Sequence, residues 1–159
     1  MKRTLVVGAL TAIIALQASA VSLGAAEPLI GIWRLERQEI NGQAGDIEPI
    51  AFQVSEARDA YSFVFSVPIN EIYVVTLRYV VRLDGSVADV KTGNGEKVGT
   101  IQMTRTAAGR YTLTMKGPNR PESRGTLTVS ADGQTLISES DATQSGRTIH
   151  AKQTFLRNQ

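Results

Sequence analysis

The sequence predicts an all-β domain, an antiparallel up-and-down β-barrel of about 8–10 strands, with a β-sandwich as the alternative. Three observations predict it. From Gly31 onward apolar and polar residues alternate with a period of two, glycine-containing turn sequences separate the runs, and most connections are short enough for a hairpin. Alternation places one face of each strand on a core and the other in water. Hairpin-length connections favour a meander in which consecutive strands are neighbours.

The start of the chain has the layout of a secretory signal peptide. A positive tip, Met1-Lys2-Arg3, precedes the apolar run Leu5–Leu16, and Ala18-Ser19-Ala20 supplies the small residues of a cleavage site. A membrane anchor is the alternative, but a spanning helix needs roughly 20 apolar residues, and this run is shorter. We expect cleavage after Ala20, with Gly24-Ala25-Ala26 as the second choice. The mature protein is then expected in the periplasm or secreted, with no membrane span.

These signals divide the chain into residues 1–20 as a signal peptide, 21–29 as a linker and 30–159 as a barrel domain. The chain has 17 Lys+Arg and 15 Asp+Glu, and the leader takes Lys2 and Arg3 but no acid. The mature domain is therefore close to neutral, and its composition gives no reason to expect a nucleic-acid partner, which calls for a clustered basic stripe.

There is no cysteine, so lipid attachment to a thiol and disulfides are both excluded. Stability must come from a hydrophobic core.

The strands are read from residues of one parity. The sets expected to face inward are Trp33 and Leu35; Tyr61, Phe63, Phe65 and Val67; Tyr73, Val75, Leu77, Tyr79, Val81 and Leu83; Ile101 and Met103; Tyr111, Leu113 and Met115; Leu127 and Val129; and Ile149, Ala151 and Phe155. Period-two alternation of this kind is typical of half-buried strands.

Turn sequences lie between these runs. The expected turns are Asp84-Gly85, Asn94-Gly95, Ala108-Gly109, Asp132-Gly133 and Gln144-Ser145-Gly146, with a longer loop at Gly117–Pro121. Glycine at these positions supplies the positive φ that tight hairpins need. The connection Asn41–Pro49 is short and rich in glycine, so it predicts no helical cap over a barrel.

Three short motifs carry a resemblance to a known group of folds. They are Gly31-Ile32-Trp33-Arg34-Leu35, with the only tryptophan, the late hairpin Ser130–Leu136, and the C-terminal Thr154–Gln159. Together they resemble lipocalin-like (calycin-type) barrels, and in particular small secreted bacterial proteins of uncharacterised function. The resemblance runs from about Gly31 to the end, and its motifs are structural. It implies a barrel and a small apolar ligand, but no reaction.

The resemblance also assigns a structural signature to Gly31, Trp33 and Arg157. In calycins the motif tryptophan closes the barrel base, and an arginine of the last strand packs across its indole. Arg157 shares the parity of Phe155 and is expected to point inward over Trp33. A guanidinium over an indole contributes about 0.5–2 kcal/mol. The alternative is a frayed terminal arginine in solvent.

Catalytic and metal-binding constellations are not apparent in the sequence. His150 is the only histidine, and its parity places it on the outer face, without the partners that a triad or metal site requires. The acids form no spaced ligand pattern, and Asp84 and Asp132 belong to turns. We therefore expect a non-enzymatic protein with no cofactor and no bound metal.

A ligand cavity in the barrel is the remaining candidate site. Its proposed residues are Arg37, Tyr73, Tyr79 and Gln153, and the inward parity also includes Arg105, Tyr111 and Ser138. An inward arginine at position 37 could hold a carboxylate bidentately, whereas its alternative is a place at the rim in water. The sequence thus favours an exported, non-catalytic barrel that binds a small apolar or amphipathic molecule. The alternative is a protein–protein interaction module, such as a barrel-type inhibitor or an envelope structural protein.

Overall fold

The computed structural model describes residues 27–118 and 120–158, and within these ranges the chain forms strands and turns but no helix. None of the described residues belongs to a helix that could cross a membrane. The strands are β1 (Gly31–Ile40), β2 (Gln43–Ala44), β3 (Ala51–Ala57), β4 (Ala60–Ile69), β5 (Ile72–Val81), β6 (Asp84–Thr92), β7 (Lys97–Ala107), β8 (Arg110–Gly117), β9 (Arg120–Val129), β10 (Thr135–Gln144) and β11 (Arg147–Arg157).

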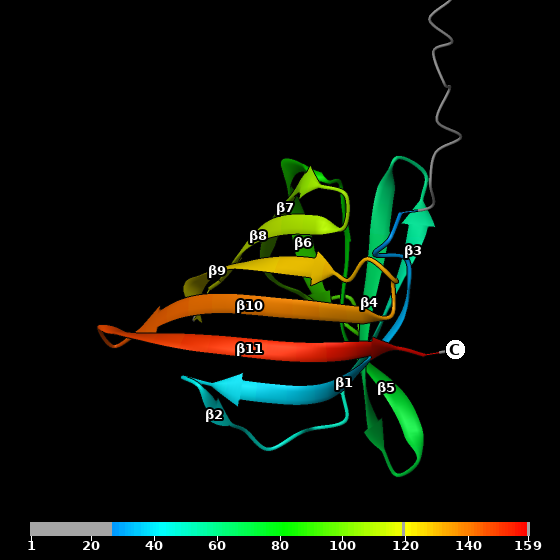
Figure 1. The fold of residues 1–159 in the computed structure, drawn as a ribbon. Coiled ribbons are helices and arrows are strands. Elements are labelled where there is room, and N and C mark those ends of the chain that lie inside the picture. Colours follow the sequence, from blue (N-terminus) through cyan, green and yellow to red (C-terminus); the bar gives the residue numbers. More distant parts are fainter. Residues whose placement is uncertain (1–26, 119, 159) are drawn as a thin grey trace, which may run out of the picture.

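The strands form one closed antiparallel barrel (Figure 1). Each strand from β3 to β11 pairs with its neighbour in sequence, and β11 returns to pair with β1. The short β2 extends the end of β1 through two residue pairs, so ten strands make up the wall. The prediction of an up-and-down barrel is confirmed, and the sandwich alternative is excluded because the first and last strands close the sheet.

Four of the predicted turns lie at their glycines. Gly95, Gly109, Gly133 and Gly146 all have positive φ and sit in the hairpins that follow β6, β7, β9 and β10. Asp84-Gly85 instead begins β6 after a turn at Leu83, and the predicted longer loop Gly117–Pro121 is short, because β8 ends at Gly117 and β9 begins at Arg120. The β4–β5 hairpin contains no glycine and is not among the predicted turns. Its turn, Asn70-Glu71, holds two non-glycine residues at φ 48° and 66°. A left-handed glutamate is uncommon, so this turn is locally unfavourable.

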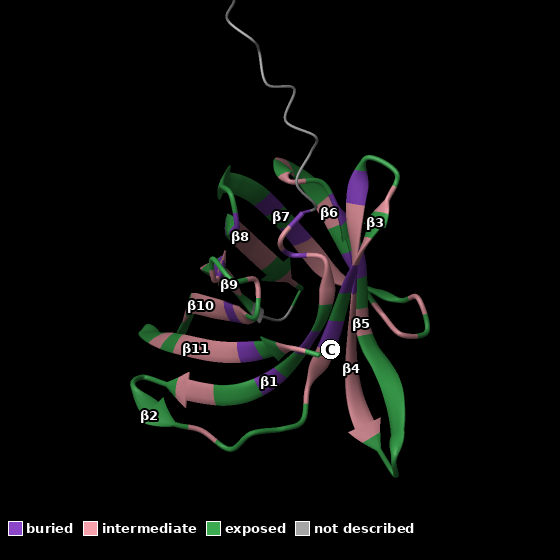
Figure 2. Ribbon diagram, turned by 45° about the vertical axis from the view of Figure 1, so that its right-hand side comes forward, coloured by how far each residue is buried: buried purple, intermediate pink, exposed green. Residues whose placement is uncertain are grey.

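The core fills one end of the barrel more densely than the other. Figure 2 shows buried segments gathered near the C-terminal end of β11, with exposure increasing toward the β10–β11 hairpin. The fully buried large side chains are Leu29, Trp33, Val54, Phe63, Val81, Ile101, Met103, Tyr111 and Leu136. This burial accounts for the period-two pattern, because the inward members of each run supply the core.

Two neighbouring strands of the wall are joined only briefly. β5 and β6 pair through Leu77–Thr92 and Arg78–Lys91, whereas β4 and β5 pair along their whole length. Beyond Arg78 the two strands diverge before the turn at Leu83, whose carbonyl instead accepts a hydrogen bond from Arg105 of β7. The divergence opens the outer surface at this point.

The domain begins earlier than the sequence predicted. The sequence places residues 27–29 in a linker, yet Glu27 and Leu29 are buried at the base of the barrel. The reason is that the Leu29 carbonyl accepts the Trp33 indole N–H, which draws this segment across the end of the barrel. The predicted signal peptide lies outside the described residues.

Candidate functional site

The base of the barrel is closed around Trp33. Its side chain is fully buried, and its indole Nε1 donates to the Leu29 carbonyl at 2.9 Å. The guanidinium carbon of Arg157 lies 4.3 Å from the centre of the indole ring. The cation–π contact that the resemblance implied is therefore present, because β1 and β11 are adjacent and Trp33 faces Arg157 in the register.

Arg157 also ties two backbone segments together, through three carbonyls. Its Nε donates to the Gly133 carbonyl at 2.5 Å, while Nη1 and Nη2 donate to the carbonyls of Ile30 and Pro28 at 2.5 and 2.7 Å. Gly31 makes room for this arrangement, because a Cβ there would collide with the guanidinium. Gly31 also has φ 151°, which other residues rarely adopt. The signature residues thus act together as a structural closure of the base.

A buried carboxylate adds a second polar contact at the base. Glu27 is 6% exposed, and its two carboxylate oxygens meet the hydroxyl of Tyr111 and the guanidinium of Arg105. Burial raises the pKa of Glu27, and a hydrogen bond from the Leu29 backbone opposes that shift. Tyr111 and Arg105 share the inward parity that the sequence identified, whereas Glu27 lay in the supposed linker and gave no signal.

The opposite end of the barrel, called the mouth here, is lined by partly buried side chains. Leu136 on β10 and Phe155 on β11 are buried, but the inward residues farther along the same strands are not (Figure 2). These partly buried inward residues are Phe65, Leu77, Leu113, Met115, Ser138, Ser140, Ile149, Ala151 and Gln153. Serine and alanine occupy less volume than the leucine and phenylalanine nearer the base, so the lining is mixed and partly accessible.

Two of the predicted cavity residues do face the interior. Tyr79 is buried and stacks on Phe63, with ring centres 4.8 Å apart. Burial raises the pKa of Tyr79 far above its ordinary value, so its hydroxyl remains neutral. Gln153 is partly buried, and its amide nitrogen donates to the side-chain oxygen of Gln38 at 2.7 Å. The sequence did not identify Gln38 as an inward residue.

Arg37 does not face the cavity, contrary to the prediction. The register of β1 against β11 shifts between Leu35, which pairs with Phe155, and Arg37, which pairs with Thr154. This bulge adds one residue and reverses the parity, so Gln38 rather than Arg37 turns inward. The Arg37 side chain is 67% exposed and forms an ion pair with Glu39 at 2.8 Å. Arg37 therefore lies in water, which was the alternative to a place in the cavity.

Tyr73 is also on the outer face, and the cause is again a bulge. Phe65 pairs with Leu77, but Ser66 pairs with Val75, which leaves Thr76 as the extra residue on β5. Parity is therefore reversed between Leu77 and Tyr73. Tyr73 is 54% exposed and borders an outer hollow of about 230 Å³ beside Ile32 and Arg34.

The β4–β5 hairpin beyond this bulge exposes apolar side chains. Ile69 is 52% exposed and Ile72 is 68% exposed, and they flank the turn on one face, while Tyr73 lies on the other. Figure 1 shows the hairpin extending past β1. The mouth therefore has an apolar projection at one side.

Among the residues that the structure describes, the one histidine is not assembled with other side chains into a catalytic site. His150 is on the outer face, with its Nδ1 2.7 Å from Asp141 Oδ1. Both side chains are well exposed. Among the described residues, no group of three or more His, Asp or Glu side chains could hold a metal ion.

Comparisons with known proteins concern the fold alone. No family model and no curated protein sequence matches this chain. Zebrafish ileal bile acid-binding protein complexed with cholic acid is similar in structure, with a TM-score of 0.55 and 18% identity over 82% of this chain and 99% of that one. A mutant of the REP1-NXSQ fatty acid transporter has a TM-score of 0.56 and 17% identity, covering 84% and 100% of the two chains.

These neighbours are barrels of the lipocalin and fatty-acid-binding type, so the fold is of the calycin type. Both are described as binding or transport proteins and neither as an enzyme. At this level of identity the likeness carries no residue of their sites over to this chain.

Proposed function

We propose that this protein binds a small apolar or amphipathic molecule in the mouth half of the barrel and performs no catalysis on it. The observation that carries the proposal is the fall in burial from base to mouth along most strands; β6, whose Val90 is buried, is an exception. Barrels of about this size either fill themselves with side chains or hold one small ligand. Here the base is filled, while small and partly exposed residues such as Ser138 and Ala151 line the mouth.

The lining of the mouth fits an apolar molecule with one or two polar groups. Leu77, Leu113 and Met115 supply apolar surface that is only partly buried. Gln153 and Gln38 supply a polar pair in the same wall. Ligand pockets are commonly of this kind, mainly apolar with a few placed polar groups. The bile acid and fatty acid named for the two structural neighbours are molecules of the same character.

The test is to fill the mouth and measure binding of an uncharged fluorescent probe, N-phenyl-1-naphthylamine. The variant Ser138→Leu/Ala151→Leu enlarges two inward side chains, and we expect it to weaken binding at least tenfold. Thr126→Leu/Thr128→Leu is the matched control, because it adds similar volume on the outer face of β9. Equal binding by the filled variant and the wild type would contradict the proposal. Native mass spectrometry of protein from its own host would identify a retained ligand.

We also propose that the protein acts outside the cytoplasm, after removal of its leader. The support is the order of charged tip, apolar run and small residues at the start of the chain. N-terminal sequencing of the mature protein is expected to give Val21, or Glu27 as the second choice. Recovery of a mature species that still begins at Met1 would contradict export by cleavage.

A further inference from the structure

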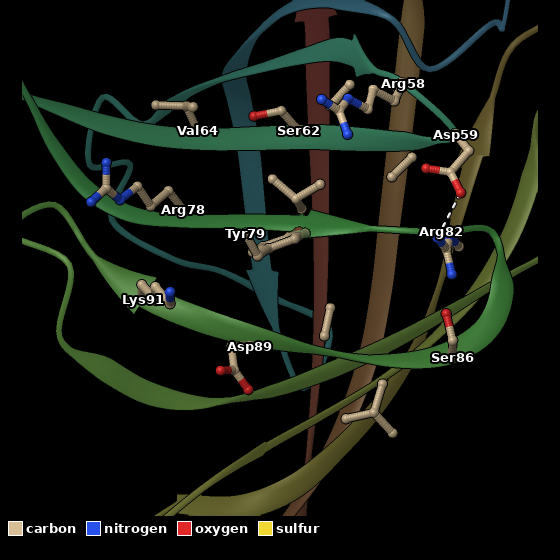
Figure 3. Close-up of a pocket in the computed structure, with 15 residues that line it drawn as sticks. Arg58, Asp59, Ser62, Val64, Arg78, Tyr79, Arg82, Ser86, Asp89 and Lys91 are labelled. Carbon is tan, nitrogen blue, oxygen red and sulfur yellow. Dashed lines mark ion pairs between the residues drawn. The ribbon is translucent and has the colours of Figure 1, made fainter.

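A hollow on the outer surface lies where β5 and β6 diverge. Its volume is about 850 Å³, and it extends over the outer face of β4, β5 and β6 (Figure 3). Val64, Val80 and Val87 contribute an apolar surface, and Val80 and Val87 are 53% and 63% exposed. Volumes of this order are typical of small-ligand sites. The hollow, called the outer groove, shares none of the partly buried residues that line the mouth, although Tyr79, which faces the interior, also borders it.

The charges around the outer groove are mainly positive. Its lining includes Arg58, Arg78, Arg82 and Lys91 but only two acids, Asp59 and Asp89. Both acids are already engaged. Asp59 pairs with Arg82 at 2.6 Å, and Asp89 pairs with Lys97 of β7 at 2.7 Å. In the part of the chain that the structure describes, Arg58, Arg78 and Lys91 form no ion pair.

Two of these cations lie directly opposite each other. Arg78 and Lys91 are one of the two residue pairs that join β5 to β6, and both point outward because Tyr79 and Val90 point inward. Side chains in such pairs have Cβ atoms roughly 4.5–5.5 Å apart, and like charges there are destabilising. Lys91 is also the register partner of Lys97 on β7, so three cations form a row across three strands. An anion placed between Arg78 and Lys91 would remove the repulsion.

We propose that the outer groove binds an amphipathic anion, with its phosphate or carboxylate head between Arg78 and Lys91 and its apolar part against Val64, Val80 and Val87. A guanidinium fork and an ammonium offer several donors to one anionic group. In Figure 3, Arg78 and Lys91 lie at one end of the groove, while Arg82 and Asp59 lie at the other. Because Asp59 already neutralises Arg82, we place the anionic head at the Arg78 end of the groove.

The experiment uses monomeric dodecyl phosphate and isothermal titration at low ionic strength. The wild type is expected to bind it, and Arg78→Gln/Lys91→Gln to bind it at least tenfold more weakly. Arg78→Lys/Lys91→Arg should restore binding, since it keeps both charges. Arg110→Gln/Arg147→Gln is the matched control, because it removes two exposed cations that line neither hollow. The mouth-filled variant Ser138→Leu/Ala151→Leu should bind dodecyl phosphate as the wild type does.

A second measurement separates the head group from the rest of the ligand. Lys91→Gln removes the repulsion, so we expect a higher Tm than the wild type without ligand, and no further rise when dodecyl phosphate is added. In the wild type, inorganic phosphate should raise Tm less than dodecyl phosphate does.

Four outcomes would overturn the proposal. They are unchanged binding by Arg78→Gln/Lys91→Gln, loss of binding only when the mouth is filled, equal effects of inorganic and dodecyl phosphate, and adsorption of the wild type to phosphatidylglycerol vesicles without binding of the monomer. The first two place the ligand elsewhere. The third makes this a simple anion site, and the fourth makes it a membrane contact.

Discussion

The base and the mouth of the barrel are built from the same ten strands, but their packing and their polar contacts differ. At the base, Trp33, Leu29 and Arg157 are held by packing and by hydrogen bonds to four backbone carbonyls. At the mouth, small side chains and an exposed hairpin replace that density. The difference indicates that stability is concentrated at one end, which leaves the other end free to accommodate a ligand.

Removing the central side chain of the base should have the largest effect. Trp33→Ala empties a fully buried site, and we expect a loss of about 3–5 kcal/mol in the free energy of unfolding. Urea denaturation followed by circular dichroism measures it. A loss below about 1 kcal/mol, within the range of an ordinary surface change, would mean that stability is not concentrated at the base.

Removing the Arg157 side chain, which packs on the Trp33 indole, should have the next largest effect. Arg157→Ala removes three hydrogen bonds and the cation–π contact, and we expect a loss of about 2–4 kcal/mol. Arg157→Lys should recover only part of this, because one ammonium cannot reach all three carbonyls as the fork does. Arg147→Ala, in the exposed β10–β11 hairpin, is the control. Full recovery by lysine would show that charge alone matters.

The free energy of unfolding should depend on pH through Glu27 at the base. Since burial raises the pKa of Glu27 in the folded state, the unfolded state loses its proton first as pH rises, and stability falls. Glu27→Gln lacks this titration, so the wild type should lose stability relative to the variant as the pH rises above the ordinary pKa of a glutamate. Urea denaturation of both proteins across this range tests the sign. The opposite slope would mean that the ion pair with Arg105 outweighs desolvation.

The smallest effect is expected at the mouth. Ile69→Ser/Ile72→Ser changes two exposed side chains of the β4–β5 hairpin, and stability should change by no more than about 0.5 kcal/mol. Thermal melting provides the measurement. A marked loss of stability would show that this hairpin is packed in solution and would remove the contrast between the two ends.

The sequence predicted the base well because its determinants are local. Alternation identified the inward residues of most strands, glycine turns marked the hairpins, and the motif around Trp33 pointed to Arg157. The first two signals depend on residue type and parity alone, whereas the pairing of Trp33 with Arg157 was implied by the resemblance to calycin-type barrels. The one error at this end was the boundary, since nothing in residues 27–29 indicates that Trp33 would bind the Leu29 carbonyl.

The mouth was predicted less well because bulges leave no trace in composition. One extra residue at Glu36 and one at Thr76 reverse the parity that follows, which moved Arg37 and Tyr73 from inside to outside. The outer groove was missed for a related reason. Arg78 and Lys91 become neighbours through strand register, and the sequence does not determine where β5 and β6 part.

The pairing of β1 with β11 has a consequence for how the barrel is made. Pro28 and Arg157 meet although they are 129 positions apart, so the ring closes through nearly the whole length of the described chain. Closing such loops is slow, whereas the hairpins between neighbours can form early. A chain leaving the ribosome therefore carries the open edge of β1 until β11 has been synthesised. Unpaired strand edges promote association, so the delay before closure governs how much of the newly made protein aggregates.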